Sequence, residues 1–109
     1  MREVKAVIRR ERMEHVIQVL HEIPGLPGIT VTPVQTFARL PPGETVGLER
    51  LDLQLCKLEA VVPVDLVTRV THAIQSAAHT GRPGDGMIFV IPVDDAIRIR
   101  TGVHGPEAL

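Results

Sequence analysis

Two kinds of hydrophobic periodicity alternate along this chain, and their order limits the folds that it can adopt. Residues 2–9 alternate between apolar and polar side chains, which is typical of a half-buried strand. Apolar side chains in residues 12–22 are spaced by three and four, which predicts an amphipathic helix. The same patterns recur in strand-like residues 29–39, 51–62 and 87–93, and in a second helical stripe, residues 65–77. The order βαββαβ predicts an α+β fold, a ferredoxin-like sandwich.

This fold also predicts where the chain is bare and where it is irregular. Both helices would cover one face of a four-stranded sheet, and an apolar face left bare usually marks an interface, so we expect self-association.

Asp65 is expected at the start of the second helix, where a carboxylate suits the free N–H groups. The leucine alternation changes phase near Cys56 and Lys57, which predicts a bulge. We expect one domain, 1–109, with a mobile loop at about 40–51 and a tail at about 103–109.

The composition excludes several classes of function. A net charge of -1 gives no electrostatic basis for binding nucleic acid, and two Phe with no Tyr or Trp provide no stacking platform for bases. No apolar run reaches about 18 residues, so we expect no membrane insertion. A single cysteine, Cys56, fits a reducing compartment and a structural thiol, and residues 1–9 are typical of a strand rather than a signal segment. A cytoplasmic protein is expected.

A glycine-rich segment near the end of the chain indicates a binding site. Residues 80–90 read T-G-R-P-G-D-G-M-I-F-V, and the backbone amides of such a loop form a natural nest for phosphate oxygens. Residues 97–100 are expected to form a short strand, on which Arg98 and Arg100 would share one face and suit phosphate. The hypothesis is a nucleotide-phosphate site. The alternative is a tight turn followed by a solvated strand end.

The chain resembles the PII family of signal-transduction proteins from residue 2 to about residue 102. The resemblance is carried by the segments T-G-R-P-G-D-G-M-I-F-V at 80–90, I-R-I-R-T-G at 97–102, I-T-V-T at 29–32, F-A-R at 37–39 and K-L-E-A-V-V-P at 57–63. It implies a compact homotrimer that binds an adenine nucleotide (ADP, AMP or ATP) in the clefts between neighbours and has no catalytic activity. It also implies a long mobile loop that docks on a transporter or an enzyme.

The resemblance also assigns residues to the nucleotide site. By position they are Gly84, Asp85 and Gly86, with backbone contacts around the phosphates; Arg98 and Arg100, clamping the phosphates from an adjacent subunit; Arg39, at the base of the loop; and Thr30, Glu59 and Val61, at the adenine end. No catalytic residue, metal ligand or tightly bound cofactor is expected.

Three departures from the family pattern shape the expected ligand. Met87 and Leu55 stand where the family usually has lysine, and Leu40 stands where it usually has glutamine. In the family these positions serve the terminal phosphate, magnesium and 2-oxoglutarate. We therefore expect ADP or AMP to compete well with ATP, and no sensing of 2-oxoglutarate. Because the chain has no tyrosine, uridylylation of a loop tyrosine is excluded, and the protein is expected to be a divergent, PII-like member.

Two other functions remain open from the sequence. One is a trimeric metal-binding or metal-responsive module, since the chain has five histidines, although none are paired at i and i+4 and surface histidines explain them equally. The other is a nucleotide-dependent sensor of a small anion such as bicarbonate. No Ser-His-Asp arrangement, P-loop or HExxH motif is present, and Asp85 is interpreted as a turn residue rather than a catalytic base.

Overall fold

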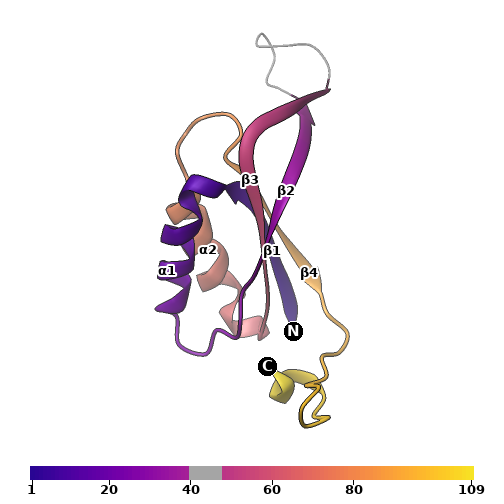
Figure 1. Cartoon of the computed structure of the whole chain (residues 1–109). Coiled ribbons are helices and arrows are strands. Elements are labelled where there is room, and N and C mark those ends of the chain that lie inside the picture. Colours follow the sequence, from indigo (N-terminus) through magenta and orange to yellow (C-terminus); the bar gives the residue numbers. More distant parts are fainter. Residues whose placement is uncertain (40–47) are drawn as a thin grey trace.

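The computed structural model describes the backbone of residues 1–39 and 48–109 and the side chains of residues 1–37 and 54–109. Two helices lie side by side against one face of a twisted sheet, and both chain termini lie at one end of the molecule (Figure 1). This two-layer arrangement confirms the ferredoxin-like prediction.

The sheet has four antiparallel strands in the order β2-β3-β1-β4. The strands are β1 (Arg2–Arg9), β2 (Thr30–Arg39), β3 (Leu48–Val62) and β4 (Gly86–Pro92). Central strand β1 pairs with β3 and β4, so Val4 lies between Ala60 and Val90. This register places the two ends of β4 at opposite ends of the molecule, beside Ile8 and Arg2.

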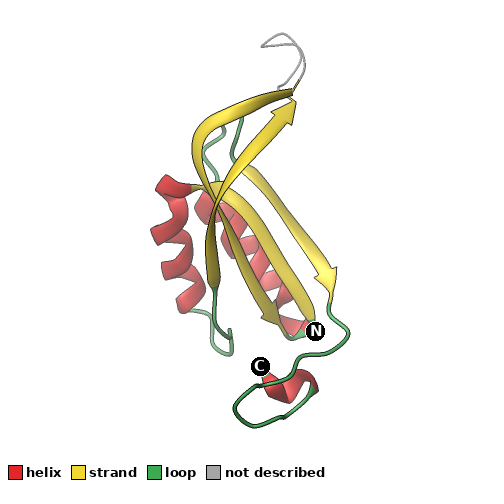
Figure 2. Cartoon of the chain, turned by 45° about the vertical axis from the view of Figure 1, so that its right-hand side comes forward, coloured by secondary structure: helices red, strands yellow, loops and turns green. Residues whose placement is uncertain are grey.

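Helices α1 (Met13–His21) and α2 (Val67–Ala78) each follow a short 3₁₀ turn, Arg10–Arg12 and Val64–Leu66 respectively. Both cover the same face of the sheet (Figure 2). Their apolar stripes meet alternate residues of β1 and β3 in one core; the buried members include Val4, Ala6, Ile8, Val16, Leu20, Cys56, Leu58, Val70 and Ile74. Burial of each larger aliphatic side chain contributes about 1.5–3 kcal/mol.

Asp65 lies at the start of the second helical segment, as expected, but its side chain does not cap α2. Asp65 lies inside the 3₁₀ turn, and α2 has Leu66 as its N-cap with no hydrogen bond from a side chain. The turn supplies a bond of its own, because the Leu66 amide donates to the Pro63 carbonyl at 3.0 Å. A backbone turn therefore does what the sequence assigned to a carboxylate.

Strand β3 is longer than the sequence predicts. It begins at Leu48, so residues 48–51 are strand rather than loop, and the remainder of the predicted loop, residues 40–47, lies outside the described residues. The predicted bulge exists but lies a few residues earlier. Val34 pairs with Leu55 while Thr36 pairs with Leu51, so β3 has two extra residues in this interval. Leu55 and Cys56 are adjacent and both buried, but only Cys56 belongs to the core under the helices, so the two side chains lie on opposite faces of β3.

The sheet face opposite the helices is open in the single chain. Met87 and Phe89 on β4 keep 62% and 44% of their surface exposed there. None of the described helices is long and apolar enough to cross a membrane.

The segment after β4 is not the short strand that the sequence predicts. Residues 98–101 form a turn, in which the Gly102 amide donates to the Arg98 carbonyl at 2.7 Å. An isolated bridge joins Ile97 to His104, and the 3₁₀ helix Gly105–Ala108 then returns the chain to the sheet. The positive φ of Gly102, 72°, allows the turn to close. The predicted tail is therefore folded.

Candidate functional site

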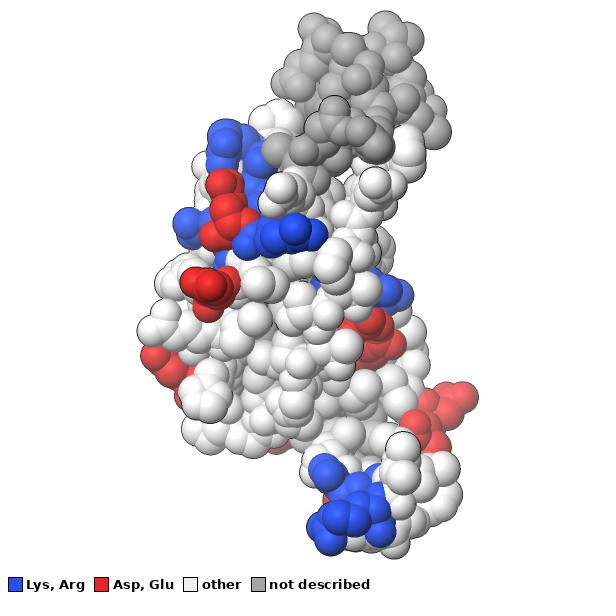
Figure 3. All heavy atoms as spheres, in the orientation of Figure 1, with Lys and Arg blue, Asp and Glu red and all other residues white. Residues whose placement is uncertain are grey.

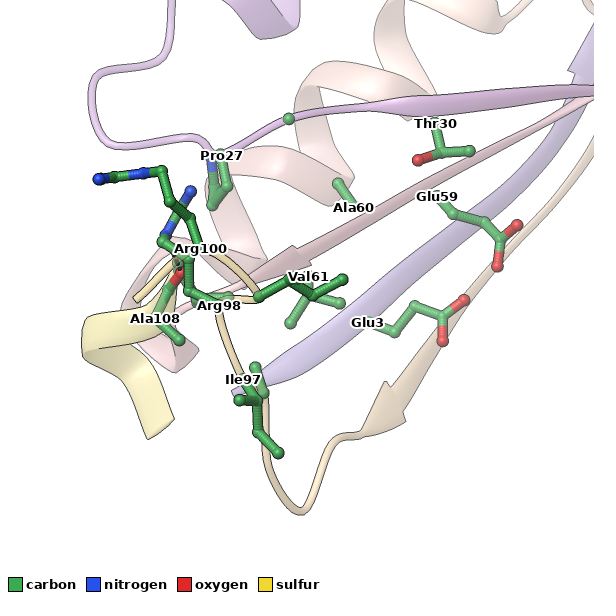
Figure 4. A pocket seen from close by; sticks show the side chains of 14 residues that line it. Glu3, Pro27, Thr30, Glu59, Ala60, Val61, Ile97, Arg98, Arg100 and Ala108 are labelled. Carbon is green, nitrogen blue, oxygen red and sulfur yellow. Dashed lines mark hydrogen bonds between the residues drawn. The ribbon is translucent and has the colours of Figure 1, made fainter. Parts of the chain in front are cut away.

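A cleft of about 750 Å³ opens at the end of the molecule that carries both termini (Figure 4). Its walls come from the start of β1, the segment leading into β2, the end of β3 and the segment after β4. They comprise Glu3, Pro27, Gly28, Thr30, Glu59, Ala60, Val61, residues 96–100, Ala108 and Leu109. The cleft therefore depends on residues from both ends of the chain.

Five of the nine predicted site residues line this cleft: Thr30, Glu59, Val61, Arg98 and Arg100. Thr30 is the register partner of Glu59 across β2 and β3, so a hydroxyl and a carboxylate lie side by side on one sheet face. Val61 lies two residues further along the same face of β3 and provides an apolar wall. The cleft thus combines hydrogen-bonding groups, an apolar surface and two cations.

The other predicted residues lie at the far end of the molecule. Gly86 begins β4 beside Ile8, whereas the last residue of β4, Pro92, lies beside Arg2 near the cleft. Six steps of about 3.3 Å along a strand separate these ends by roughly 20 Å. The backbone of Arg39 lies at the tip of β2, paired with Leu48, and its side chain is outside the described residues. One chain therefore does not bring the glycine loop and the two arginines together.

The turn that carries the two arginines is held by its own hydrogen bonds. The Arg98 amide donates to the Val103 carbonyl at 2.9 Å, and the Gly105 amide donates to the Ala96 carbonyl at 2.9 Å. Nε of Arg98 donates to the Ala108 carbonyl at 2.9 Å, which ties this guanidinium to the C-terminal segment. Figure 4 shows both arginine side chains at the Pro27 and Ala108 end of the cleft. They are the only Lys or Arg residues of 93–109 and form a separate patch (Figure 3).

Asp95 closes the base of this turn. Its Oδ1 accepts the amides of Ala96 at 2.9 Å and Gly105 at 3.0 Å, and its Oδ2 lies 2.8 Å from Nδ1 of His104. The hydrogen bond from His104, followed by those from the two amides, holds the pKa of the Asp95 carboxyl below its usual range. The Asp95 carboxylate therefore joins the residues before and after the turn that carries Arg98 and Arg100. The residues that match the family motif gave no sign of this role.

A second carboxylate faces Glu59 in the cleft. The interaction with the Glu59 carboxyl, followed by burial, raises the pKa of Glu3, and the same interaction lowers the pKa of Glu59. Glu59 is also paired with Lys57 at 3.5 Å. The sequence did not single out Glu3, because its position opposite Val61 depends on the strand register.

The glycine loop is built around the side chain of Asp85. Its Oδ2 accepts the amides of Thr80 at 2.7 Å and Gly81 at 2.9 Å, and its Oδ1 accepts the Thr80 hydroxyl and Nε of Arg9, the latter at 3.0 Å. Burial opposes ionisation of Asp85, but these hydrogen bonds outweigh it and hold the pKa of the carboxyl well below its usual range. Asp85 is therefore an ionised structural residue, as expected for a turn aspartate.

The backbone amides at the end of the glycine loop are not used by the Asp85 side chain. Within the described part of the chain, the amides of Gly84 and Asp85 have no hydrogen-bond acceptor. Gly86 has φ of 103°, and a Cβ at this position would lie 1.7 Å from the Val7 carbonyl oxygen. Only glycine fits there, since the loop must turn into β4 against β1. The arrangement leaves amide donors available at the start of the strand.

Two of the three departures from the family pattern can be placed. Met87 lies beside the glycine loop with 62% of its surface exposed. A methionine side chain is uncharged, so it cannot replace a lysine at this position. Leu55 is buried, with 1% of its surface exposed. Leu40 lies outside the described residues. Among residues 1–37 and 54–109, no group of three or more His, Cys, Asp or Glu side chains could hold a metal ion.

Comparisons with known proteins agree with this architecture. A sequence model of the family described as "Nitrogen regulatory protein P-II" matches residues 1–103. Over 114 residues the chain is 44% identical to the nitrogen regulatory protein P-II of Azospirillum brasilense and 45% identical to that of Rhodospirillum rubrum, covering 100% of this chain and of each relative. The crystal structure of Arabidopsis thaliana PII bound to citrate has a TM-score of 0.80 at 39% identity, over 99% of this chain and 91% of that chain. The chain belongs to the P-II family of regulatory signal-transduction proteins.

Proposed function

We propose that this PII-family protein binds an adenine nucleotide at clefts between neighbouring subunits and controls a partner protein through the loop that follows Arg39. The observation that carries the proposal is the division of the predicted site. The base-end residues and both arginines line one cleft, while the glycine loop lies at the opposite end of the same chain. Two copies arranged head to tail would complete the site.

The chemistry of each half supports a nucleotide. Thr30 and Glu59 can hydrogen-bond a base or ribose, and Val61 offers an apolar surface to a ring. Arg98 and Arg100 supply planar donors that suit phosphate oxygens, and the free amides near Gly84 suit the same oxygens from the other side. The citrate of the Arabidopsis relative is also a multiply charged anion.

Assembly follows from the same surfaces. We propose a homotrimer in which the open sheet faces meet, because the face beside β4 exposes Met87 and Phe89 in the single chain. In a closed ring of three copies, each copy provides its cleft to one neighbour and its glycine loop to the other. Three equal clefts would result.

The nature of the ligand follows from the lost cations. Met87 and Leu55 carry no charge, so the terminal phosphate of ATP has fewer partners than the inner phosphates. Each missing charge-assisted hydrogen bond lowers affinity by about 1.5–3 kcal/mol. We propose that ADP or AMP competes well with ATP, that 2-oxoglutarate is not sensed, and that the protein carries out no catalysis. Nucleotide occupancy would shift the loop population only through unequal affinity for its states.

Titration calorimetry with ATP, ADP, AMP and cyclic AMP tests the proposal. The wild type should release heat with at least one of them, and the double variant Arg98→Ala with Arg100→Ala should not. The control is Arg69→Ala, which removes an exposed arginine near the start of α2, outside both half-sites, and should bind as the wild type does. An absence of heat from every nucleotide with the wild type, at about millimolar ligand, would refute nucleotide binding.

The partner is tested separately. A pull-down with and without ADP, using the full chain and a variant in which residues 41–46 are replaced by Gly and Ser, should recover a transporter or enzyme only with the native loop. Recovery of the same protein by both chains would show that the loop is not the docking element.

A further inference from the structure

Arg9 is the one polar or charged residue that is buried among the described side chains, with 5% of its surface exposed. It is the last residue of β1, and it reaches across to the glycine loop. Its Nε donates to Oδ1 of Asp85 at 3.0 Å, and its Nη2 donates to the Pro83 carbonyl at 2.6 Å. Burial of an unpaired guanidinium is very unfavourable, and the contacts with Asp85 and Pro83 offset this cost.

The ion pair between Arg9 and Asp85 lies where it affects the binding of phosphate groups. The Asp85 carboxylate is ionised and lies within the loop whose amides would receive phosphate groups. A lone negative charge there would repel a polyphosphate. Arg9 supplies the opposite charge at hydrogen-bonding distance, and the side chains of Arg9 and Asp85 are only 6% and 24% exposed, so solvent screens the pair weakly.

The guanidinium acts on the loop and not on a ligand. Because Arg9 is buried and two of its nitrogens are already engaged, it has little surface to offer a bound molecule. Its two acceptors flank Gly84, one on each side in sequence. The contact therefore restrains the backbone at the position where the free amides lie.

We propose that Arg9 is a positioning residue for the glycine loop: it holds Asp85 and the Pro83 carbonyl, and so fixes the amides of Gly84 and Asp85 in the arrangement that receives phosphate. This inference rests on the proposed nucleotide-binding function. It assigns to Arg9 a role that the match to the family's site residues does not give it.

The test compares ADP and AMP binding in three variants of the full chain. Arg9→Met removes both hydrogen bonds and the charge, Arg9→Lys keeps the charge without the planar fork, and Arg9→Met with Asp85→Asn removes both charges. The control is Arg69→Met, which deletes an exposed arginine near the start of α2. Circular dichroism and thermal unfolding establish whether each variant is folded.

Arg9→Met should weaken ADP binding roughly 10- to 100-fold, the loss expected for one or two charge-assisted contacts. It should weaken AMP binding less, because the effect acts through the phosphates. Arg9→Lys should lie between Arg9→Met and the wild type. The double variant should recover part of the loss, since Asp85→Asn removes the uncompensated charge, and Arg69→Met should have no effect.

Equal affinity of the wild type and Arg9→Met for ADP would overturn the inference, as would an equal loss for ADP and AMP in a folded Arg9→Met protein. If Arg9→Met does not fold, Arg9→Lys decides: unchanged ADP affinity in that variant contradicts the role of the fork. Failure of the wild type to bind any nucleotide would instead refute the proposed function, so the two failures are distinguishable.

Discussion

Asp85 illustrates how one side chain can organise a binding loop without contacting the ligand. Its two oxygens accept hydrogen bonds from Thr80, Gly81 and Arg9, which closes residues 80–85 into a compact turn. The carboxylate faces inward, so the amides that follow are left for other partners. The residue type was predictable from the glycine-rich motif. The partner Arg9, 76 residues away, was not, because a lone arginine at a strand end carries no distinctive pattern.

Acid should weaken this loop. The pKa of Asp85 is depressed in the folded chain, so its contribution to the free energy of unfolding is present above the unfolded-state pKa of about 3.9 and is lost as pH falls towards the folded value. The difference in unfolding free energy between the wild type and Asp85→Asn, measured by urea titration, should therefore be constant from pH 7 to about 5 and shrink below about pH 4. A difference that is independent of pH down to about pH 2.5 would contradict this account.

Gly86 is required by sterics rather than by flexibility. A Cβ would lie 1.7 Å from the Val7 carbonyl oxygen, and φ is 103°. Gly86→Ala should lower the free energy of unfolding by about 2–4 kcal/mol, because β4 must move away from β1. Gly28→Ala is the matched control, since a Cβ at Gly28 meets nothing within 4 Å. Similar unfolding midpoints in urea for the two variants would argue against this packing.

At the scale of elements, the turn from Asp95 to Gly105 is the part that the sequence described least well. The alternation of Arg98 and Arg100 about Ile99 suggested a strand, and Ile99 is instead 99% exposed at a turn. A four-residue alternation is too short to separate the two structures, and the turn depends on Asp95 and the glycines that flank it. Strands β1 and β4 and both helices were predicted within one or two residues at most ends, because their periodicity extends over seven residues or more.

The hydrogen bonds between Asp95 and the turn predict a loss of affinity for ADP when Asp95 is replaced. Asp95→Ala removes three hydrogen bonds at the base of the turn, so Arg98 and Arg100 should lose their fixed position. Affinity for ADP should fall about 5- to 30-fold while the unfolding midpoint changes little, since the turn is exposed. Asp94→Ala, one residue earlier and also exposed, serves as the control. Calorimetry would show the account to be wrong if both variants bound ADP equally.

For the whole molecule, the central observation is the separation of two half-sites. The sheet order places the start of β4 and the cleft at opposite ends of β1, roughly 20 Å apart. The resemblance assigned nine residues to the site and placed the two arginines on a neighbour, and the structure shows that five of the nine line one cleft. Neither the depth of the cleft, with Glu3 and the C-terminal Ala108 in its wall, nor the strand register behind it could be obtained from motifs alone.

A mixing experiment tests the shared site most directly. Gly84→Glu places a negative charge on the loop, and Arg98→Ala with Arg100→Ala removes the clamp; each protein alone should bind no ADP. Refolded together in equal amounts, they should form mixed trimers in which about one quarter of the clefts combine an intact loop with an intact pair of arginines. ADP binding measured by calorimetry should return at about that stoichiometry. If the mixture binds no ADP while the wild type does, the two halves do not meet between copies, and the account is contradicted.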